Sequence, residues 1–271
     1  MNIALIGAGN LATNLAHALT RAGHKILAVY SRTMQSAQML SERLEQAFPD
    51  AEPVTPTDKL ESVTHQADIY IIAVRDDVLH DVAANLRSLM PDALIVHTAG
   101  TMQMDVIPGK GRGVLYPMQT FSKQRIVRFE EIPVFVEAEN DADLTLLKEL
   151  ASTISNNVMA VSGHQRKSLH LAAVFCCNFA NHCSAIADFL LDEQGIPFNV
   201  MLPLIRETTA KLSQCTPREA QTGPAVREDK KVMDNHVCAL EKAGHDDLAQ
   251  IYRMMSDSIM AFKQKVHVKN S

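Results

Sequence analysis

Short apolar runs alternate with amphipathic stretches along the first half of the chain. The runs are continuous and rich in Ile, Val and Ala, which indicates strands buried on both faces. Strands are predicted at 2–6, 25–30, 68–74, 93–98, 114–116 and 133–137, with a weaker one near 52–55; helices are predicted at 10–22, 35–48 and 77–89. This alternation is typical of a doubly wound, mostly parallel α/β sheet of the Rossmann type.

The strand pattern stops after about residue 160, and a helical pattern takes over. Helices are predicted at 164–193, 199–214, 227–243 and 246–265. The chain is therefore expected to hold two domains, a Rossmann-like domain at 1–160 and an all-α C-terminal domain at 161–271, in keeping with usual domain sizes.

Residues 169–191 form the longest apolar stretch, which polar residues such as His170, Asn178 and Asp188 interrupt. A bilayer span needs about 20 predominantly apolar residues, so a buried helix is the expectation here. The five cysteines include no C-x-x-C pair and are expected to be reduced, buried thiols. Residues 1–7 lack a basic leader. A soluble, cytoplasmic protein without a membrane partner is expected.

Composition excludes several classes of protein. Hydrophobic residues make up 46% of the chain, which is enough for a core and excludes a disordered chain. The formal net charge is −5 and there is no Trp, so neither a basic field nor stacking platforms for a nucleic-acid partner are expected.

A glycine-rich turn follows the first predicted strand and opens the first predicted helix. Its residues are Gly7, Ala8, Gly9, Asn10, Leu11 and Ala12. In this context G-x-G-x-x-A predicts dinucleotide binding, because glycines allow a tight turn and let the backbone approach a pyrophosphate at the helix N-terminus. The alternative is a glycine turn that only packs.

The end of the second strand indicates which dinucleotide is bound. An acidic residue there would bind the ribose 2′-hydroxyl of NAD, but this chain has Ser31, Arg32 and Thr33. A guanidinium and two hydroxyls suit a 2′-phosphate, so NADP is the predicted cofactor. Arg32 could instead be a solvated surface charge.

Loops after the later strands are expected to line the same crevice. The candidates for cofactor contacts are Ala73, Val74, Thr98 and Gly100, and those for substrate contacts are Gln119 and Thr120. A purely structural role in turns is equally open for each of them.

Polar residues form a stripe on the predicted helix at 164–193. At 100° per residue, Lys167, His170 and Asn178 fall within about an 80° arc. Such a stripe marks either a solvated face or a site. As a site, His170 is the expected acid–base group, Asn178 would orient the substrate, and Lys167 is a reserve proton donor. Further on, Arg227 is a candidate to hold an anionic substrate, although it could simply pair with Asp229.

The glycine turn with Ser31-Arg32-Thr33 resembles the superfamily of ketopantoate reductase, pyrroline-5-carboxylate reductase, 6-phosphogluconate dehydrogenase and deazaflavin-dependent NADP oxidoreductases. Nearly the full length is similar to bacterial NADP oxidoreductases that join a Rossmann-like half to a C-terminal helical domain of unknown function. The matching stretches are 73–77, 116–121, 170–178 and 222–224 with Arg227, Asp229 and His236. The resemblance implies dimerisation through the helical domain and an active site between the domains.

The chain departs from that family pattern at two positions, because Arg75 stands where relatives tend to carry Pro, and Tyr116 where they tend to carry His. The missing histidine weakens the expectation of an acid–base group on that loop. The leading hypothesis is an NADP(H)-dependent oxidoreductase that transfers a hydride to or from a small, anionic carbonyl, hydroxyl or imine compound. The rival is a non-catalytic NADP-binding sensor or scaffold that dimerises through its helices. Use of a deazaflavin co-substrate stays open.

Overall fold

The computed structural model describes residues 1–267, with side chains up to residue 263. The chain divides into two compact units, the first comprising Met1–Cys183 and the second beginning at Ser184. The last strand ends at Ala160, where the sequence predicts the domain boundary. That boundary stays a prediction, because the compact units divide inside the helix that follows.

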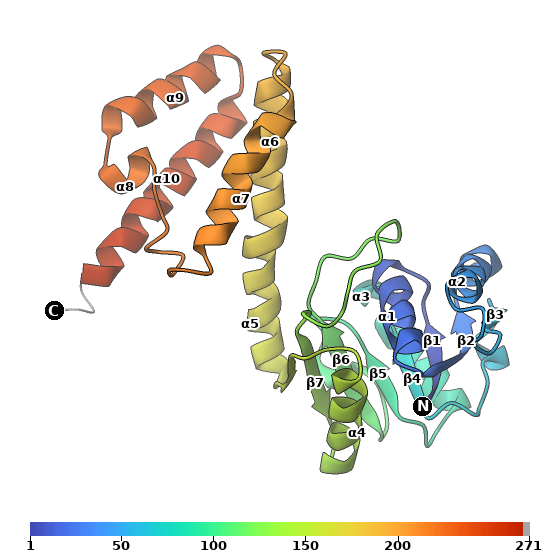
Figure 1. Ribbon diagram of the computed structural model, residues 1–271. Helices are drawn as coiled ribbons and strands as arrows, with labels where there is room; N and C mark the ends of the chain where they lie inside the picture. Colours follow the sequence, from blue (N-terminus) through green and yellow to red (C-terminus); the bar gives the residue numbers. More distant parts are fainter. Residues whose placement is uncertain (268–271) are drawn as a thin grey trace. The chain divides into compact units, whose positions relative to one another are not determined.

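An eight-stranded sheet forms the centre of the first unit (Figure 1). Its strands are β1 (Asn2–Ile6), β2 (Lys25–Tyr30), β3 (Thr55–Thr57), β4 (Ile69–Ile72), β5 (Ile95–His97), β6 (Arg112–Pro117), β7 (Val134–Ala138) and β8 (Val158–Ala160). Their order is β3-β2-β1-β4-β5-β6-β7-β8, and all neighbours are parallel except β6 and β7. The predicted doubly wound, mostly parallel sheet is therefore confirmed.

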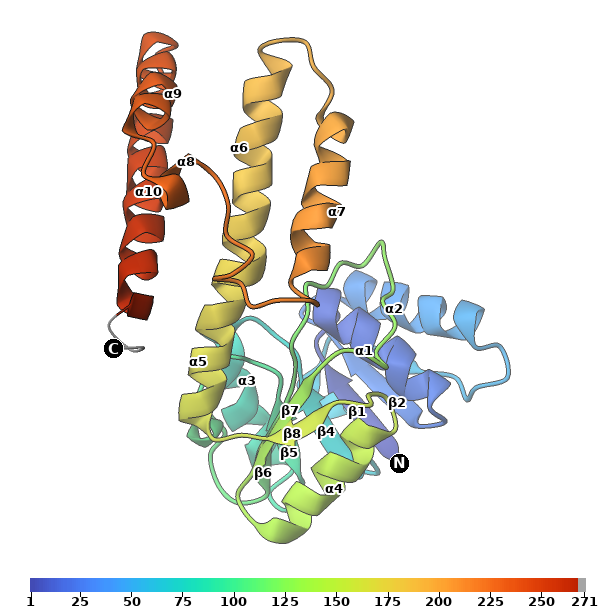
Figure 2. The ribbon, with the colours of Figure 1, turned by 60° about the vertical axis from the view of Figure 1, so that its left-hand side comes forward.

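Helices cover both faces of this sheet. They are α1 (Asn10–Arg21), α2 (Met34–Ala47), α3 (Asp76–Leu89) and α4 (Asp141–Ser152), with short 3-10 turns at Leu60–Ser62 and Met104–Val106. One core contains side chains of α1, α2 and α4, and a second core, on the other face, contains those of α3. The turned view in Figure 2 shows α4 beside β7 and β8.

Two elements of this unit are absent from the sequence prediction, and one is displaced. Helix α4 begins at an Asn140 cap that accepts a hydrogen bond from the Asp143 N–H at 2.9 Å. Strand β8 has only three residues, too few for a recognisable pattern. Strand β3 lies at Thr55–Thr57 rather than 52–55, because its register is set by pairing with β2.

The helical region after residue 160 contains more elements than predicted. They are α5 (Gly163–Ala173), a π-helical segment η3 (Val174–Phe179), α6 (Ala180–Asp192), η4 (Phe198–Met201), α7 (Leu202–Lys211), α8 (Pro224–Arg227), α9 (Lys230–Lys242) and α10 (Asp246–His267). Segments α5, η3 and α6 are continuous, as predicted for 164–193. The predicted polar stripe assumed 100° per residue throughout, and that periodicity does not continue through a π-helix, whose hydrogen bonds span five residues.

The predicted helix at 227–243 is wrong at its start. Pro224 begins the separate turn α8, and Glu228 ends it with φ 58°. Asp229 then caps α9 by accepting a hydrogen bond from the Val232 N–H at 3.2 Å. The proline fixes an earlier helix start, so Arg227 ends one helix instead of beginning the next.

The expectation of a buried helix at 169–191 is also wrong. Gly163–Asp192 is long and apolar enough to cross a membrane by length and composition, and none of its most apolar window is buried. No other helix within residues 1–267 meets that criterion. Leu171, Phe175 and Phe179 are each about half exposed or more.

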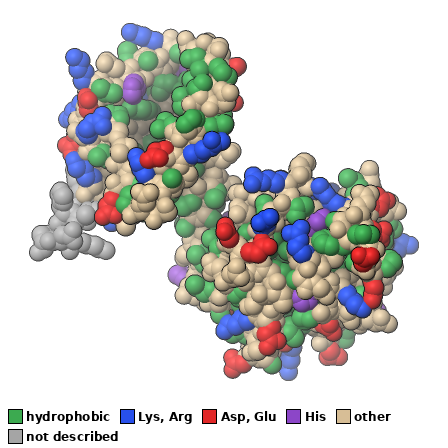
Figure 3. Space-filling view, viewed as in Figure 1, with side chains coloured by type: hydrophobic (Ala, Val, Ile, Leu, Met, Phe, Trp, Pro, Cys, Tyr) green, Lys and Arg blue, Asp and Glu red, His purple; other side chains and the backbone are tan. Residues whose placement is uncertain are grey.

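The cysteines follow the same pattern. All five are free, but Cys176, Cys177, Cys183 and Cys238 are exposed and Cys215 is half-buried. The prediction of buried thiols is therefore wrong, because four of them lie on exposed surfaces of the helices. Figure 3 shows hydrophobic side chains spread over the surface of the helical region.

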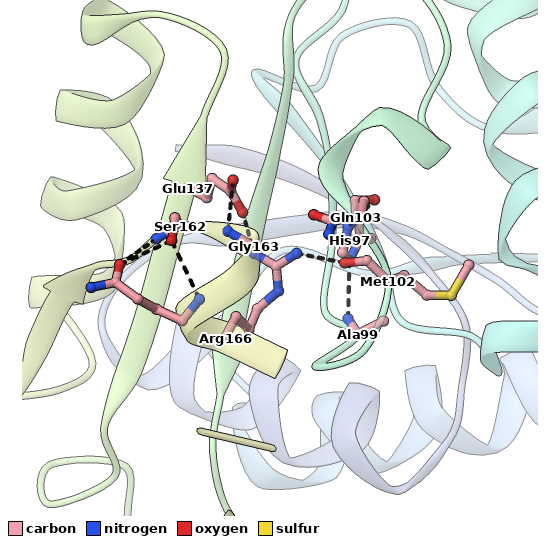
Figure 4. A network of polar contacts seen from close by, with 9 residues as sticks. His97, Ala99, Met102, Gln103, Glu137, Ser162, Gly163 and Arg166 are labelled. Carbon is pink, nitrogen blue, oxygen red and sulfur yellow. Dashed lines mark hydrogen bonds and ion pairs between the residues drawn. The ribbon is translucent and has the colours of Figure 1, made fainter. Parts of the chain in front are cut away.

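A buried arginine attaches the start of α5 to the sheet (Figure 4). The Arg166 side chain is fully buried, forms an ion pair with Glu137 of β7 and donates to the Met102 carbonyl. Glu137 also accepts a hydrogen bond from the Gly163 N–H at 3.1 Å. A Cβ at Gly163 would lie 2.1 Å from the Gln103 side-chain oxygen, so a larger residue there would require the Gln103 side chain to shift.

His97, at the end of β5, is the buried imidazole of the same network. Its Nδ1 accepts a hydrogen bond from the Ala99 N–H at 3.1 Å, and its Nε2 lies 3.3 Å from the Gln103 carbonyl oxygen. Burial, assisted by the charge of Arg166, lowers the pKa of His97 to about 4. The imidazole is therefore neutral in the folded protein at neutral pH.

This burial predicts a pH-dependent stability. The unfolded chain binds a proton at His97 near pH 6.5, whereas the folded chain does so only near pH 4, so stability is lost as the pH falls through that window. We expect the free energy of unfolding to fall by about 3 kcal/mol between pH 6.5 and pH 4 because of His97. Urea unfolding at pH 7 and at pH 4 should show a smaller loss in His97→Asn than in the wild type. The exposed His65→Asn serves as the control, and equal losses in all three proteins would contradict the prediction.

Candidate functional site

The glycine turn after β1 is built for a phosphate. Gly7 has φ 128°, and a Cβ there would lie 2.3 Å from the Ala73 carbonyl oxygen, so the turn requires glycine. A Cβ at Gly9 would meet nothing within 4 Å, so the space above this residue is open. Gly9 caps α1 without a side-chain hydrogen bond, and the first turn holds no acidic residue.

The other residues of the turn fit this arrangement. Ala8 and Ala12 are buried against the sheet, Leu11 is half-buried and Asn10 is exposed. The first amides of α1 are thus available to an anion, and the helix dipole favours a negative charge there. The residues present fit the pyrophosphate of a dinucleotide.

The end of β2 lies at the same edge of the sheet. Arg32 and Thr33 are exposed and Ser31 is half-buried. The Thr33 hydroxyl caps α2 by accepting a hydrogen bond from the Ser36 N–H at 3.4 Å and donates to the Ser36 hydroxyl. Arg32 remains the candidate for a 2′-phosphate, because no hydrogen bond or ion pair within residues 1–267 engages its guanidinium.

Arg75, which differs from the family pattern, lies at the end of β4. Its guanidinium forms an ion pair with Asp77, which holds the pKa of that carboxyl below its usual range, and Arg32 contributes to the shift more weakly. Asp77 therefore lies within electrostatic range of the predicted 2′-phosphate site. Its negative charge would oppose a phosphate, and the paired Arg75 offsets it.

The candidate residues in the loops after β4 and β5 differ in burial. Ala73 and Val74 are half-buried and border the glycine turn. Thr98 is buried, and its hydroxyl donates to the Ile72 carbonyl at 3.3 Å. Its hydroxyl is therefore already bonded to β4, whereas Gly100 lies further along the loop, beside α5.

Three residues from distant parts of the chain meet beside β5 and β6. The His170 Nδ1 lies 3.2 Å from the Tyr116 hydroxyl oxygen. A Cβ at Gly100 would lie 2.6 Å from His170 Nδ1 and 2.9 Å from Tyr116 Cζ. Tyr116 is buried, which raises the pKa of its phenol, and His170 is half-buried. The sequence analysis missed Tyr116, reading it only as the loss of a histidine.

The remaining candidates are less engaged. Lys167 and Asn178 are exposed, Asn178 within the π-helical segment. Gln119 and Thr120 are both exposed, and they bond to each other, with the Gln119 side-chain oxygen accepting from the Thr120 N–H at 2.8 Å. Arg227 is exposed and lies in the second compact unit. The structure therefore brings together His170 and Gly100 but leaves the other roles as predictions.

Asn14 is a further residue that the sequence analysis missed. It is fully buried on α1, where its amide donates to the Ser122 carbonyl and its oxygen accepts from the Val127 N–H. These bonds fix the long connection between β6 and β7 against α1. A polar residue on the buried face of a predicted helix was the available signal.

Comparisons with known proteins agree with this geometry. Residues 2–100 match the family described as coenzyme F420-dependent NADP oxidoreductase, and residues 132–259 match a domain of unknown function, DUF2520. No match was found among curated proteins.

Solved structures give the more extensive matches. A putative NADP oxidoreductase from Bacteroides fragilis shares 46% identity over 96% of this chain and 98% of its own, with a TM-score of 0.87. A Thermotoga maritima protein shares 20% identity over 97% and 99%, with a TM-score of 0.70. A Plasmodium falciparum pyrroline carboxylate reductase with NADP bound shares 12% over 96% and 97%, with a TM-score of 0.58. The last two show a shared fold.

The glycine turn, the Arg32 edge and the match to the Bacteroides fragilis protein over nearly the full length of both chains agree with one another. The chain belongs to this family of NADP oxidoreductases.

Proposed function

We propose that this NADP-dependent oxidoreductase transfers a hydride to or from a small, anionic substrate with a carbonyl, hydroxyl or imine group, with His170 as its acid–base group. The observation that carries the proposal is the position of His170. Its imidazole lies against Gly100, just beyond the carboxyl end of β5, on the sheet edge that holds the glycine turn.

The strand order supports this placement. In doubly wound sheets the dinucleotide crosses the carboxyl edge at the point where the strand order reverses, here between β1 and β4. The β1 and β2 ends offer the phosphate contacts, so the nicotinamide half would extend toward β4, β5 and β6. Gly100 and Tyr116 belong to that half of the edge, and His170 contacts both.

The chemistry then needs one hydride and one proton. Bound NADPH supplies the hydride to the substrate carbon. In the reductive direction the carbon–oxygen or carbon–nitrogen π bond breaks, and the doubly protonated imidazole of His170 gives the proton on Nε2 to the heteroatom, which leaves a neutral ring with its proton on Nδ1. In the oxidative direction the same proton moves in reverse, and the neutral ring accepts it at Nε2 while its own proton is on Nδ1. Nε2 has no hydrogen-bond partner in the part of the chain that the structure describes.

Other residues complete the proposal in lesser roles. Asn178 would orient the substrate and Lys167 would be a reserve donor, since both lie on the same helical segment as His170. Gln119 and Thr120 would hydrogen-bond the substrate. Arg227 would hold its anionic group, and the anionic character of the substrate rests on this residue.

We also propose that the protein is a cytoplasmic homodimer assembled through its helices. Apolar side chains with more than a third of their surface exposed recur along the helical region, at Leu171, Phe175, Phe179, Phe189, Ile196, Val200, Leu202, Leu204, Leu212, Ile251, Met254, Met255 and Phe262. Exposed apolar side chains in such number support an interaction site, and a second copy is the simplest partner that covers them.

The cofactor proposal predicts a loss of preference for NADP in Arg32→Ala. Removing the guanidinium removes charge-assisted hydrogen bonds to the 2′-phosphate, so NADP affinity should fall about 10- to 100-fold while NAD affinity changes little. Titration calorimetry with both dinucleotides measures this. Arg21→Ala, at the exposed end of α1, should leave both affinities unchanged. A wild-type protein that binds NAD more tightly than NADP would contradict the proposal.

The catalytic proposal predicts a loss of turnover in His170→Ala. Loss of a general acid–base group should lower kcat/KM about 100-fold or more, and NADPH affinity should change only a few-fold. The assay follows nicotinamide absorbance with a panel of small keto acids and cyclic imines. His164→Ala, exposed on the same helix, is the control. NADPH binding without turnover of any compound by the wild type would favour a sensor instead.

The dimer proposal predicts that Phe175→Glu dissociates the protein. Burying one phenylalanine contributes about 1.5–3 kcal/mol, so the dimer dissociation constant should rise at least about 10-fold. Sedimentation equilibrium measures it. Met39→Glu is the matched control, because Met39 is 60% exposed on α2 and Phe175 is 63% exposed. A wild-type protein that sediments as a monomer would contradict the proposal.

A further inference from the structure

The contact between Tyr116 and His170 involves one nitrogen of the imidazole. The Tyr116 hydroxyl oxygen lies 3.2 Å from Nδ1, and the two ring centroids are 6.3 Å apart. Within residues 1–267 the hydroxyl has no second hydrogen-bond partner, and Nε2 has none. The tyrosine therefore engages Nδ1 alone and leaves Nε2 to whatever binds at the carboxyl edge.

The contact between Tyr116 and His170 requires a glycine at position 100. A single methyl group there would lie 2.6 Å from Nδ1 and 2.9 Å from Tyr116 Cζ, closer than real Cβ atoms approach other atoms. Gly100 has no positive φ that would explain a glycine through the backbone. The residue at position 100 must be small because the side chains of Tyr116 and His170 meet beside it.

The chemistry of the two groups determines which one donates. Burial raises the pKa of the Tyr116 phenol, so the hydroxyl keeps its proton near neutral pH. A phenol is a stronger acid than the N–H of a neutral imidazole, and an imidazole nitrogen is a stronger base than a phenol oxygen. The hydroxyl therefore donates to Nδ1, which places the proton of the neutral imidazole on Nε2.

We propose that Tyr116 is a positioning residue for His170: its hydroxyl occupies Nδ1, so that Nε2 carries a proton and faces the substrate. This inference rests on the proposed role of His170. When Nδ1 carries a proton, in the doubly protonated ring or after Nε2 has given its proton to the substrate, the same hydroxyl can accept from the Nδ1–H, because a hydroxyl is both donor and acceptor. Tyr116 thus keeps the ring in one orientation in both charge states.

The test begins without any substrate. In protein labelled with ¹⁵N-histidine, at a pH where the imidazole is neutral, long-range ¹H–¹⁵N spectra report the state of each ring nitrogen, with His170→Asn assigning the signal. In Tyr116→Phe the Nδ1 resonance should move toward that of a nitrogen with a free lone pair. Tyr70→Phe is the matched control, because Tyr70 lies in the same sheet and its hydroxyl donates a hydrogen bond to the Thr64 carbonyl. An unchanged Nδ1 resonance in Tyr116→Phe would overturn the pairing.

A second variant keeps both side chains and removes only their contact. Gly100→Ala places a methyl group between them and should shift the Nδ1 resonance in the same direction as Tyr116→Phe. Circular dichroism of each variant verifies that the fold is retained. Equal Nδ1 resonances in Gly100→Ala and the wild type would overturn the role given to Gly100.

The kinetic part of the test uses a substrate that the wild type turns over. Tyr116→Phe should lower kcat/KM about tenfold through the loss of one hydrogen bond, with NADPH affinity unchanged. Because Tyr116 acts through His170, the double variant Tyr116→Phe/His170→Ala should be no slower than His170→Ala. Additive losses would overturn the positioning role. Full activity of His170→Ala would instead overturn the proposed function, and the spectra would still decide the pairing.

Discussion

The ion pair between Arg166 and Glu137 is the interaction on which the candidate site depends. Breaking a buried ion pair by removing one partner costs about 3–5 kcal/mol, because the other charge is left uncompensated. Here the Arg166 side chain is fully buried and joins the first turn of α5 to β7 and to the loop after β5. His170 follows one helical turn later. This ion pair therefore helps to fix the distance of His170 from Gly100.

At the carboxyl edge of the sheet, the backbone and the side chains have different proposed roles. At the β1 end, the tight turn at Gly7 and the open space above Gly9 leave backbone amides accessible to an anion. At the β5 and β6 ends, Gly100 serves the opposite purpose, because the space above it is filled by an imidazole and a phenol. The predicted cofactor contacts thus come from groups that folds of this class supply, whereas the proposed acid–base group, His170, comes from α5.

The sequence predicted the features that depend on neighbours along the chain. Strand β2 was predicted with its observed bounds, and the glycine turn with its helix, because apolar runs and turn residues are local signals. Helix α4 carried such signals too, in its Asn140 cap and its Leu144, Leu147 and Leu150 spacing, and was overlooked. The register of β3 could not be predicted, because it depends on pairing with β2.

The features that were mispredicted depend on contacts far apart in sequence. Tyr116 and His170 are 54 positions apart, so reading Tyr116 alone as a lost histidine gave no reason to pair them. The apolar helix was expected to be buried because its composition makes exposure to water unfavourable. Composition does not show whether the same chain or a second molecule covers the helix. A helix that must be hidden by a second molecule and one hidden by its own chain have the same hydrophobic pattern. Only the fold distinguishes them, and here it leaves Phe175 and Phe179 exposed, on the helix that also carries His170. Any partner that covers this helix would therefore act directly on the element that positions the proposed acid–base group.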